Sequence, residues 1–472
     1  MAGLSCTTEP VTPSQELLEA WDREHVWHAF TQMAEYEPLL IERGDGVHLY
    51  DTAGNRYIDG SASMWCNVHG HRHPRLDAAL NRQLGLVAHT TNLGLSNPTT
   101  VELARRLVEI APAGLSKVFF SGDGSSATEA ALKIAFQYHL QAGAGGQRPR
   151  TRYIALGEAY HGDTLGAIGV GGVDRFTAMF APLTFEAIRL PTPGLPAGLT
   201  PTADGGPRTD PSGQAATAAE TLGRLEHLLT EQGEAIAAVI MEPLVQAAGG
   251  ILVHPQGFLR DVRELTRRHG VLLILDEIAV GFGRTGTMFA CEQEGVSPDI
   301  LCLGKGLTAG YLPMAATLTT DTIWQAFLGS HADGRAFYHG HTFGGNPLAA
   351  AVALESLAIF RDEAVLERLP ALIAHLQTRL TQLAEMPHVG GIRQCGLMAG
   401  IDLVANKQTG EPFPWAARTG ARACLAARRS GALLRQLGDT VVIMPPLSIS
   451  PDKLDELVAA AAAGIKSVTS PL

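Results

Sequence analysis

Residues 270–286 read GVLLILDEIAVGFGRTG, a stretch in which five apolar residues run directly into Asp276 and Glu277. A short continuous apolar run of this kind is typical of a strand that is buried on both faces, as in a parallel sheet. Open α/β sheets bind ligands at the carboxyl ends of their strands. The stretch therefore predicts at least one carboxylate at the ligand-binding edge of such a sheet.

The segments around this stretch alternate short apolar runs with longer ones of helical period. Apolar runs rich in β-branched residues predict strands, and apolar residues at helical spacing predict helices. The expected strands are SKVFF (116–120), RYIAL (152–156), AIAAVIM (235–241), GVLLILD (270–276) and DILCLG (299–304), and the expected helices are ATEAALKIAFQYH (127–139) and FLRDVRELTRRHG (258–270). This alternation predicts an α/β fold with a parallel sheet covered by helices.

The pattern changes from about residue 346. Helical segments at 349–360 and 369–384 are followed by strand-like runs within 389–404 and 441–446. We interpret this region as a smaller α+β domain.

The composition argues against several classes of protein. The 472 residues are 46% apolar and 18% charged, with a formal net charge of −11 and no basic block. We therefore expect neither nucleic acid nor a membrane as a partner. The first residues lack the basic and apolar regions of an export signal, which favours the cytoplasm. Two Gly/Pro-rich stretches, 142–150 and 191–214, predict exposed loops.

The cysteines and histidines show no metal-site spacing. The six cysteines are spread along the chain without a C-x-x-C pair, which argues against both a disulfide framework and a zinc site. Three histidines crowd into HGHRHP (69–74), but no cysteine or carboxylate stands at ligand spacing from them. We expect no metal.

Lys305 is the first candidate for catalysis. Lysine occurs six times in this chain against thirty arginines, and Lys305 follows an apolar run between two glycines. Burial lowers the pKa of an ammonium group, and a neutral amine attacks aldehydes. Taken alone, such a lysine is more simply read as a side chain that reaches from the sheet edge into solvent. Asp276, 29 residues earlier, and a Gly/Ser loop favour the catalytic interpretation.

That loop is SGDGSSATEAALK (121–133), which leads from an expected strand into a helix. Its glycines permit close backbone approach, its serines offer hydroxyl groups, and a helix N-terminus attracts phosphate. Ser126 and Glu129 have the spacing of a capping box. Asp123 places a negative charge in this loop, so its side chain must point away from a bound phosphate. A phosphate loop, a strand-end aspartate and a strand-end lysine together match the needs of pyridoxal phosphate.

Four motifs carry a family resemblance. LDEIAVGFGRTG (275–286), LGKGLTAG (303–310), AYHGDT (159–164) and HGHTFGGNP (339–347) resemble the motifs of the class III, or omega-type, pyridoxal-phosphate aminotransferases. The likeness spans about residues 20 to 465. It implies a fold type I enzyme with a mostly parallel seven-stranded sheet and a smaller α+β domain.

The resemblance also implies a division of the chain. Residues 1–75 would contribute to the small domain and to a dimer contact, residues 76–345 would form the large cofactor-binding domain, and residues 346–472 would form the C-terminal small domain. The active unit would be a homodimer with its active sites at the subunit interface. Its small-molecule substrates would be an amino donor and a keto-acid acceptor.

Position by position, the resemblance implies roles for twelve residues. Lys305, Asp276 and Tyr160 would be catalytic, with Lys305 as the Schiff-base lysine and Asp276 as the partner of the pyridine nitrogen. The cofactor would also contact Gly124, Ser125, His161 and, from the neighbouring subunit, Thr342. The substrates would contact Phe30, Trp65, Tyr160, Arg284, Gly340 and Arg435, with Met64 at a position where the family often has a second tryptophan.

Two other interpretations stay open. An omega-amino acid:pyruvate or diamine aminotransferase of the same class would share Asp276, Lys305 and Thr342 and differ in its substrate tunnel. A regulator that binds the cofactor without turnover would need an added DNA-binding domain, for which residues 1–20 are too short and too acidic.

Overall fold

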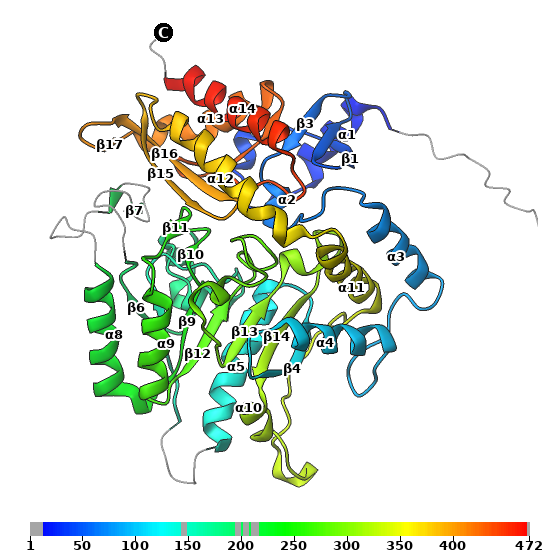
Figure 1. The fold of residues 1–472 in the computed structure, drawn as a ribbon, viewed down its shortest axis with the longest axis vertical. Helices are drawn as coiled ribbons and strands as arrows, with labels where there is room; N and C mark the ends of the chain where they lie inside the picture. Colours follow the sequence, from blue (N-terminus) through cyan, green and yellow to red (C-terminus); the bar gives the residue numbers. More distant parts are fainter. Residues whose placement is uncertain (1–12, 143–148, 194–199, 202–206, 209–216, 470–472) are drawn as a thin grey trace, which may run out of the picture.

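The computed structural model describes residues 13–142, 149–193, 200–201, 207–208 and 217–469 (Figure 1). The expected loops at 142–150 and 191–214 fall largely outside the described residues. None of the helices in the described part is long and apolar enough to cross a membrane.

A seven-stranded sheet forms the centre of the larger part of the molecule (Figure 1). In spatial order its strands are β4 (Leu115–Ser121), β14 (Ala315–Thr320), β13 (Ile300–Leu303), β12 (Leu272–Asp276), β9 (Ile236–Met241), β5 (Arg152–Leu156) and β6 (Ile188–Leu190). Only β14 runs antiparallel to its neighbours. The five strands expected from apolar runs are confirmed, while β14 and β6 were not expected.

The two faces of this sheet are buried in two separate apolar clusters. On β12, Leu273 and Leu275 belong to one cluster and Ile274 to the other, as the alternation of side chains along a strand requires. Helix α5 (Gly124–Ala142) covers the second face with the alanines of its buried side, including Ala127 and Ala131. Small side chains allow this helix to lie close to the strands.

Further helices surround the sheet (Figure 1). Helix α9 (Phe258–Arg268) packs on β12 and on α8 (Ala218–Gln232), while α4 (Pro98–Ile110) and α11 (Pro347–Asp362) pack together beside β4. The other helices of this larger part are α3 (Pro74–Leu84), α6 (Leu165–Val170), α7 (Asp174–Thr177) and α10 (Asp321–Gln325). Its short strands are β7 (Thr200–Pro201), β8 (Pro207–Arg208), β10 (Val245–Gln246) and β11 (Leu252–Val253). The helices expected at 127–139, 258–270 and 349–360 are confirmed.

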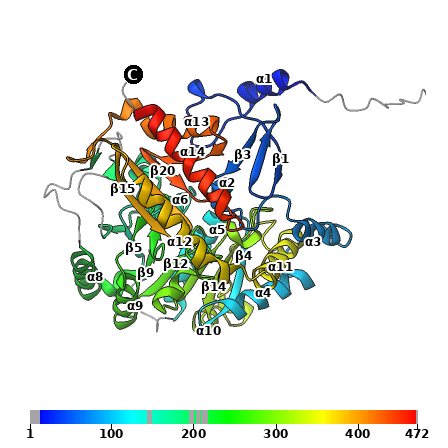
Figure 2. The same ribbon diagram turned by 45° about the horizontal axis from the view of Figure 1, so that its top comes forward.

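The beginning and the end of the chain meet in a second region, at the top of Figures 1 and 2. Its first sheet joins β1 (Ile41–Asp45), β2 (His48–Asp51) and β3 (Arg56–Asp59) to β18 (Ala432–Leu433), which pairs parallel with β3. Its second sheet contains β15 (Val389–Cys395), β16 (Met398–Asn406), β17 (Glu411–Pro412), β19 (Arg435–Leu437) and β20 (Thr440–Ile443), beside helices α1 (Gln15–His25), α12 (Val365–Leu383), α13 (Thr419–Arg429) and α14 (Pro451–Thr469). Residues 56–59 thus share a sheet with residues 432–433, and the expected division of the chain at residues 75 and 345 stays a prediction.

Arg393 connects this second region to the larger one through hydrogen bonds. Its guanidinium donates to the carbonyl oxygens of Gly250, at 2.7 Å from Nη2, and Ile251, at 3.1 Å from Nε. The same group is paired with the buried carboxylate of Asp402 on β16, with 2.7 Å between Nη2 and Oδ1. The loop between β10 and β11 is thereby held against the C-terminal sheet.

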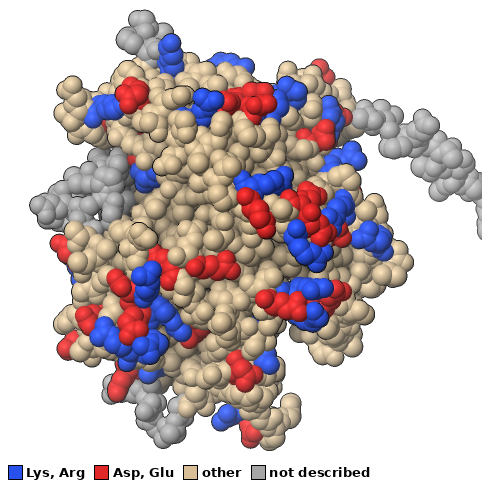
Figure 3. Space-filling view, in the orientation of Figure 1, with Lys and Arg blue, Asp and Glu red and all other residues tan. Residues whose placement is uncertain are grey.

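Charged side chains on the face drawn in Figure 3 lie in mixed groups of both signs. Near α3 and α11, Arg75 bridges Glu355 and Asp362. Near α8 and α9, Arg268 pairs with Glu226. This face therefore presents no broad area of one sign.

Candidate active site

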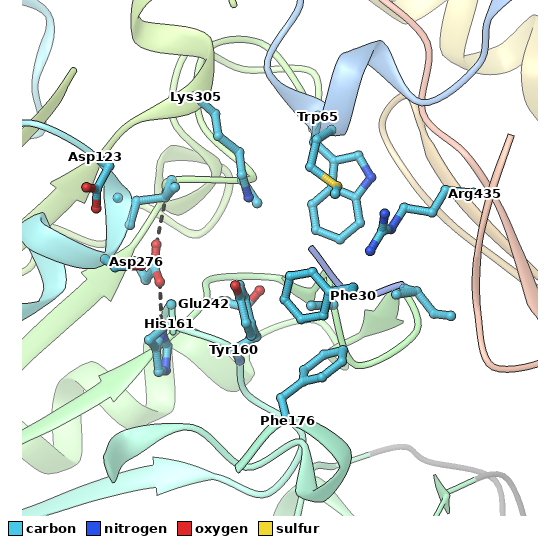
Figure 4. Close-up of a pocket in the computed structure, with 18 residues that line it drawn as sticks. Phe30, Trp65, Asp123, Tyr160, His161, Phe176, Glu242, Asp276, Lys305 and Arg435 are labelled. Atoms are coloured by element: carbon cyan, nitrogen blue, oxygen red, sulfur yellow. Dashed lines mark hydrogen bonds and ion pairs between the residues drawn. The ribbon is translucent and has the colours of Figure 1, made fainter. Parts of the chain in front are cut away.

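A cavity of about 260 Å³ lies at the carboxyl ends of β9, β12 and β13, beneath the second region (Figure 4). Most of the residues expected at the site line it. They are Phe30, Trp65, Gly124, Ser125, Tyr160, His161, Asp276, Lys305 and Arg435. Residues from distant parts of the sequence thus converge where an open α/β sheet is expected to bind its ligand.

Asp276 ends β12 and is buried, with 3% of its surface exposed. Its Oδ2 lies 2.8 Å from Nδ1 of His161, and its Oδ1 accepts a hydrogen bond of 3.0 Å from the backbone N–H of Ile278. These two bonds fix the orientation of the carboxylate. The other ring nitrogen of His161, Nε2, is buried and has no hydrogen-bond partner among the described residues.

Lys305 follows β13 and extends its amine into the same cavity (Figure 4). Its Nζ lies 4.8 Å from the centre of the Trp65 ring, and among the described residues it forms no ion pair. Burial lowers the pKa of this amine, an effect that the nearby charges of Asp276 and Glu242 oppose. A lysine with a lowered pKa has more of the neutral form that attacks a carbonyl carbon.

The first turn of α5 forms another wall of the cavity. Asp123 precedes the helix, and its Oδ1 accepts bonds from the backbone N–H of Ser126 at 2.9 Å and from the Ser126 hydroxyl at 3.1 Å. The capping box expected from Ser126 and Glu129 is wrong, because Glu129 instead accepts a bond from the backbone N–H of Gly166. Asp123 is the cap, and Figure 4 shows its carboxylate turned away from Lys305.

The segment 159–164 packs directly on this turn. The Ser125 hydroxyl accepts a bond of 3.2 Å from the backbone N–H of Asp163, and Thr128 donates to the carbonyl oxygen of His161. Gly162 has φ +124°, and a Cβ atom there would lie 2.1 Å from Oγ of Ser125. The glycine is therefore required both by its backbone conformation and by its neighbour.

Glu242 is a cavity residue that the sequence analysis missed. It directly follows β9, is 3% exposed, and accepts bonds from the backbone N–H groups of Tyr160 at 3.1 Å and Ala247 at 2.9 Å. Burial raises its pKa to about 7, with the charge of Asp276 acting in the same direction. The sequence does carry a signal for Glu242, because this residue directly follows the apolar run AIAAVIM (235–241), as Asp276 follows an apolar run.

Aromatic and apolar side chains form the other side of the cavity (Figure 4). Phe176, which the sequence analysis did not single out, stands edge to face with both Phe30, at 5.3 Å between ring centres, and Tyr160, at 5.7 Å. The Tyr160 hydroxyl donates to Oδ2 of Asp163 at 2.6 Å. Burial, reinforced by this bond, raises the pKa of Tyr160, so its phenol stays protonated.

Arg435 is the cation on this apolar side. Its Cζ lies 5.9 Å from the centre of the Phe30 ring, and burial lowers its pKa. Among the described residues, the charged groups that act on it include no carboxylate. A half-buried guanidinium without a protein anion is suited to bind a carboxylate of a ligand.

Three of the expected residues do not line this cavity. Arg284 is 2% exposed, and its guanidinium donates to the carbonyl oxygens of Pro445 at 2.5 Å and Asn67 at 3.3 Å. These bonds join three segments of the chain, and the substrate contact expected for Arg284 stays a prediction. Gly340 and Thr342 lie in an exposed segment of the chain.

The crowded histidines have partners of their own. His69 lies 3.0 Å from the Ser356 hydroxyl, His71 lies 3.0 Å from Asp59, and His73 lies 3.4 Å from Glu363. Among the described residues, no group of three or more His, Cys, Asp or Glu side chains could hold a metal ion.

The residues present fit pyridoxal phosphate. Gly124 and Ser125, in the first turn of α5, line the cavity, and Gly124 lies so close to Ile278 that a Cβ atom there would come within 2.8 Å of its Cγ2. Lys305 offers an amine for which the described part of the chain supplies no ion-pair partner, and Asp276 offers a buried carboxylate held by two bonds. Fold and site together define a pyridoxal-phosphate-dependent transferase of fold type I.

Comparison with known sequences specifies the family. The family described as Aminotransferase class-III matches residues 31–463, and the chain belongs to it. The chain is 52% identical to the adenosylmethionine-8-amino-7-oxononanoate aminotransferase of Nitratidesulfovibrio vulgaris, over 96% of this chain and 82% of that protein. It is 50% identical to the enzyme of the same name from Aquifex aeolicus, over 93% and 95% of the two chains.

Solved structures agree with this assignment. The enzyme of that name from Methanocaldococcus jannaschii superposes with a TM-score of 0.88 at 39% identity, covering 96% of this chain and 99% of the other. An amine transaminase from an uncultivated Pseudomonas species, solved in its pyridoxal-phosphate-bound form, superposes with a TM-score of 0.84 at 35% identity over 94% and 98% of the chains. Pyridoxal phosphate is the cofactor of this family.

Substitution of Gly162 tests how the segment 159–164 packs on the first turn of α5. Gly162→Ala should raise the Kd for pyridoxal phosphate about tenfold and destabilise the protein by about 1–3 kcal/mol, because the methyl group displaces Ser125. Equilibrium dialysis and thermal unfolding measure the two effects. Gly223→Ala, in α8 and outside the cavity lining, is the matched control, since a Cβ atom there meets nothing within 4 Å. Equal behaviour of the two variants would contradict the proposed role of this contact.

Proposed function

We propose that this protein converts 8-amino-7-oxononanoate to 7,8-diaminononanoate in biotin biosynthesis, with S-adenosylmethionine or L-lysine as the amino donor. Four stretches resemble diaminopelargonate synthase, the enzyme of this step. They are VWHAFTQM (26–33), SMWCNVHGHRHP (63–74), MEPLVQAAGG (241–250) and LGDTVVIMPP (437–446). The names of the relatives at 50–52% identity support the same assignment.

Arg435 is the observation that carries the proposal. In 8-amino-7-oxononanoate the carboxylate and the reacting ketone stand near opposite ends of an apolar chain. Figure 4 shows Arg435 and Lys305 on opposite sides of Trp65, with aromatic side chains between them. A short keto acid such as pyruvate has its carboxylate next to the ketone and has no apolar chain for the aromatic side chains to contact.

The chemistry follows from the positions of three side chains. Pyridoxal phosphate, when bound, supplies an electron-withdrawing ring that stabilises negative charge at the substrate carbon. Asp276, oriented by His161 and Ile278, would keep the ring nitrogen protonated. Lys305 would first hold the cofactor and then, displaced by the donor amine, move a proton from the substrate carbon. The acceptor half-reaction uses the same amine in reverse.

Other side chains would hold the cofactor and the substrates. Gly124 and Ser125, at the start of α5, would bind the phosphate through backbone N–H groups and the hydroxyl. Tyr160 would stack on the cofactor ring. Arg435 would bind the carboxylate of the keto acid. Phe30 and Trp65 would line the passage between Arg435 and Lys305.

The amino donor is the open part of the proposal. Members that use S-adenosylmethionine commonly have tyrosine where this chain has Phe30, and a subgroup with FTQM in this position includes users of L-lysine. Purified protein should therefore be assayed with 8-amino-7-oxononanoate and each donor separately. Formation of 7,8-diaminononanoate with either donor supports the proposal. Turnover with pyruvate as acceptor, and none with 8-amino-7-oxononanoate, would favour the omega-amino acid or diamine alternative.

Arg435→Ala should lower kcat/KM for the keto acid about 30-fold or more, mainly through KM, while kcat/KM for the donor changes little. Loss of a charge-assisted bidentate contact in a partly buried site costs about 2 kcal/mol or more. Steady-state kinetics with both substrates varied separates the two effects. Arg429→Ala, on the exposed side of α13, is the control. Equal losses for donor and acceptor would assign Arg435 to structure.

We also propose a cytoplasmic homodimer with active sites at the subunit interface. Exposed apolar side chains gather on two adjoining segments, where Leu86 is 80% exposed and Leu93 is 69% exposed on one, and Phe343 is 61% exposed on the other. The rings of His89 and Phe343 lie 4.7 Å apart and join the segments. A dimer that covers them would bring Thr342 to the phosphate of the partner. Analytical ultracentrifugation tests this, and a monomer with full activity would contradict it.

A further inference from the structure

The segment α2 (Ala62–Trp65) is a left-handed turn. Its four residues have φ values of 46°, 46°, 68° and 70°, and none of them is glycine. L-residues disfavour this conformation because Cβ approaches the following carbonyl oxygen, and runs of such residues are rare. Strained backbone of this kind persists only where its surroundings hold it in place.

Asp59, at the end of β3, is the group that holds the turn. Its carboxylate is 1% exposed and accepts bonds from the Ser63 hydroxyl at 2.7 Å and from the Ser63 backbone N–H at 3.0 Å. The backbone N–H and hydroxyl of Ser61 add weaker bonds to Oδ1, at 3.3 and 3.4 Å. Four donors, two from Ser63 within the turn and two from Ser61 directly before it, therefore converge on one buried side chain.

His71 completes this arrangement from the other side. Its Nε2 lies 3.0 Å from Oδ2 of Asp59, while its Nδ1 lies 3.2 Å from the side-chain amide nitrogen of Asn67. Because the amide nitrogen can only donate, Nδ1 accepts and the ring proton is on Nε2, which donates to Asp59. Burial acts to raise the pKa of Asp59, but the bonds from His71 and Ser63 lower it, so the carboxylate stays charged.

The turn carries two side chains into the active-site cavity. Trp65 is 6% exposed, and its ring centre lies 4.8 Å from Nζ of Lys305. Met64, which is 42% exposed, lines the same cavity. A right-handed turn of the same length would point both side chains elsewhere, because the direction of Cβ follows the backbone angles.

We propose that Asp59 is a positioning residue for transamination, which holds the left-handed turn so that Trp65 stands against the Lys305 amine and Met64 shapes the substrate passage. Asp59 does not line the cavity, and it acts through the turn. This inference depends on the membership of the aminotransferase family and not on the identity of the acceptor.

The test compares Asp59→Asn with a matched buried aspartate. Asp51, at the end of β2, is 6% exposed and accepts four bonds, from groups of Ala53, Asn55 and Tyr57, but none from the turn. Asp59→Asn should lower kcat/KM for both substrates roughly 10- to 100-fold, since small displacements near reacting groups cost about this much. Asp51→Asn should leave kcat/KM within about twofold of the unchanged protein.

Two further measurements separate positioning from general instability. Amide hydrogen exchange of the cofactor-free protein should be faster across residues 61–66 in Asp59→Asn and unchanged there in Asp51→Asn. Adding Ala62→Gly to Asp59→Asn should recover activity, because glycine adopts left-handed angles without steric cost. If Asp59→Asn does not fold, Ser63→Ala removes the 2.7 Å bond alone and provides the same comparison.

Faster exchange confined to the turn, together with rescue by glycine, would establish the proposal. Kinetics and exchange in Asp59→Asn that match those of Asp51→Asn would overturn it. Loss of activity that glycine does not relieve, with unchanged exchange at 61–66, would overturn it as well.

Discussion

Lys305→Ala should lower the rate of transamination about 10⁴-fold or more while the protein keeps its fold. The variant loses the amine that holds the cofactor and the group that moves the proton at the substrate carbon, and no other lysine lines the cavity among the described residues. The rate of the half-reaction with donor, measured in a single turnover, reports this loss directly. Circular dichroism and thermal unfolding check that the fold is retained.

The control for this variant is Lys453→Ala. Lys453 forms an ion pair of 2.7 Å with Glu456 on the outer surface of α14, and surface pairs of this kind contribute little to stability. Its replacement should leave the half-reaction unchanged. A Lys305→Ala protein that turns over at the normal rate would refute the role given to this amine.

Asp276→Asn should lower kcat about 10²- to 10³-fold, the second-largest effect we expect. Asparagine keeps the shape of the side chain and can still accept the bond from Ile278, but it removes the negative charge that favours a protonated ring nitrogen. The cofactor should still bind. The measurements are kcat with saturating substrates and the visible absorbance of the bound cofactor.

Asp299→Asn is the matched control for Asp276→Asn. Asp299 immediately precedes β13, at the opposite edge of the same sheet, where it pairs with Arg263 at 2.7 Å. This substitution should affect stability and leave kcat unchanged. If both variants kept normal kcat, the charge of Asp276 would have no part in the reaction.

Much of the fold can be predicted from the pattern of apolar residues along the sequence. The strands β12 and β13 are continuous apolar runs because both of their faces are buried, and such runs are visible in the sequence. The antiparallel strand β14 reads AATLTT, which lacks that signal, and β6 has only three residues. The polarity of β14 is tolerated because Thr317 finds a partner in the carbonyl oxygen of Ala127.

The site was predictable where a residue's chemistry is tied to the end of a strand. Asp276 and Lys305 stand at such ends, and the structure brings them to one cavity. Arg284 could not be placed in this way, because arginine serves equally to bind an anion or to bind backbone carbonyls, and only the tertiary structure shows Pro445 and Asn67 beside it.

Local backbone geometry was the least predictable part. The capping of α5 by Asp123 competes with the capping box of Ser126 and Glu129, and the contact between Glu129 and Gly166 decides between them. Likewise, nothing in the amino-acid types of residues 62–65 indicates a left-handed turn. Its cause is the carboxylate of Asp59, which accepts bonds from both the backbone and the side chain of Ser63.

The most direct test of this account is chemical identification of the lysine that holds the cofactor. The protein loaded with pyridoxal phosphate is treated with borohydride, which fixes a lysine-bound aldehyde as a stable secondary amine, and is then digested and mapped by mass spectrometry. We predict that the pyridoxyl group is found on Lys305, within the peptide that contains LGKGLTAG. A pyridoxyl group on any of the other five lysines, or on none, would contradict the account.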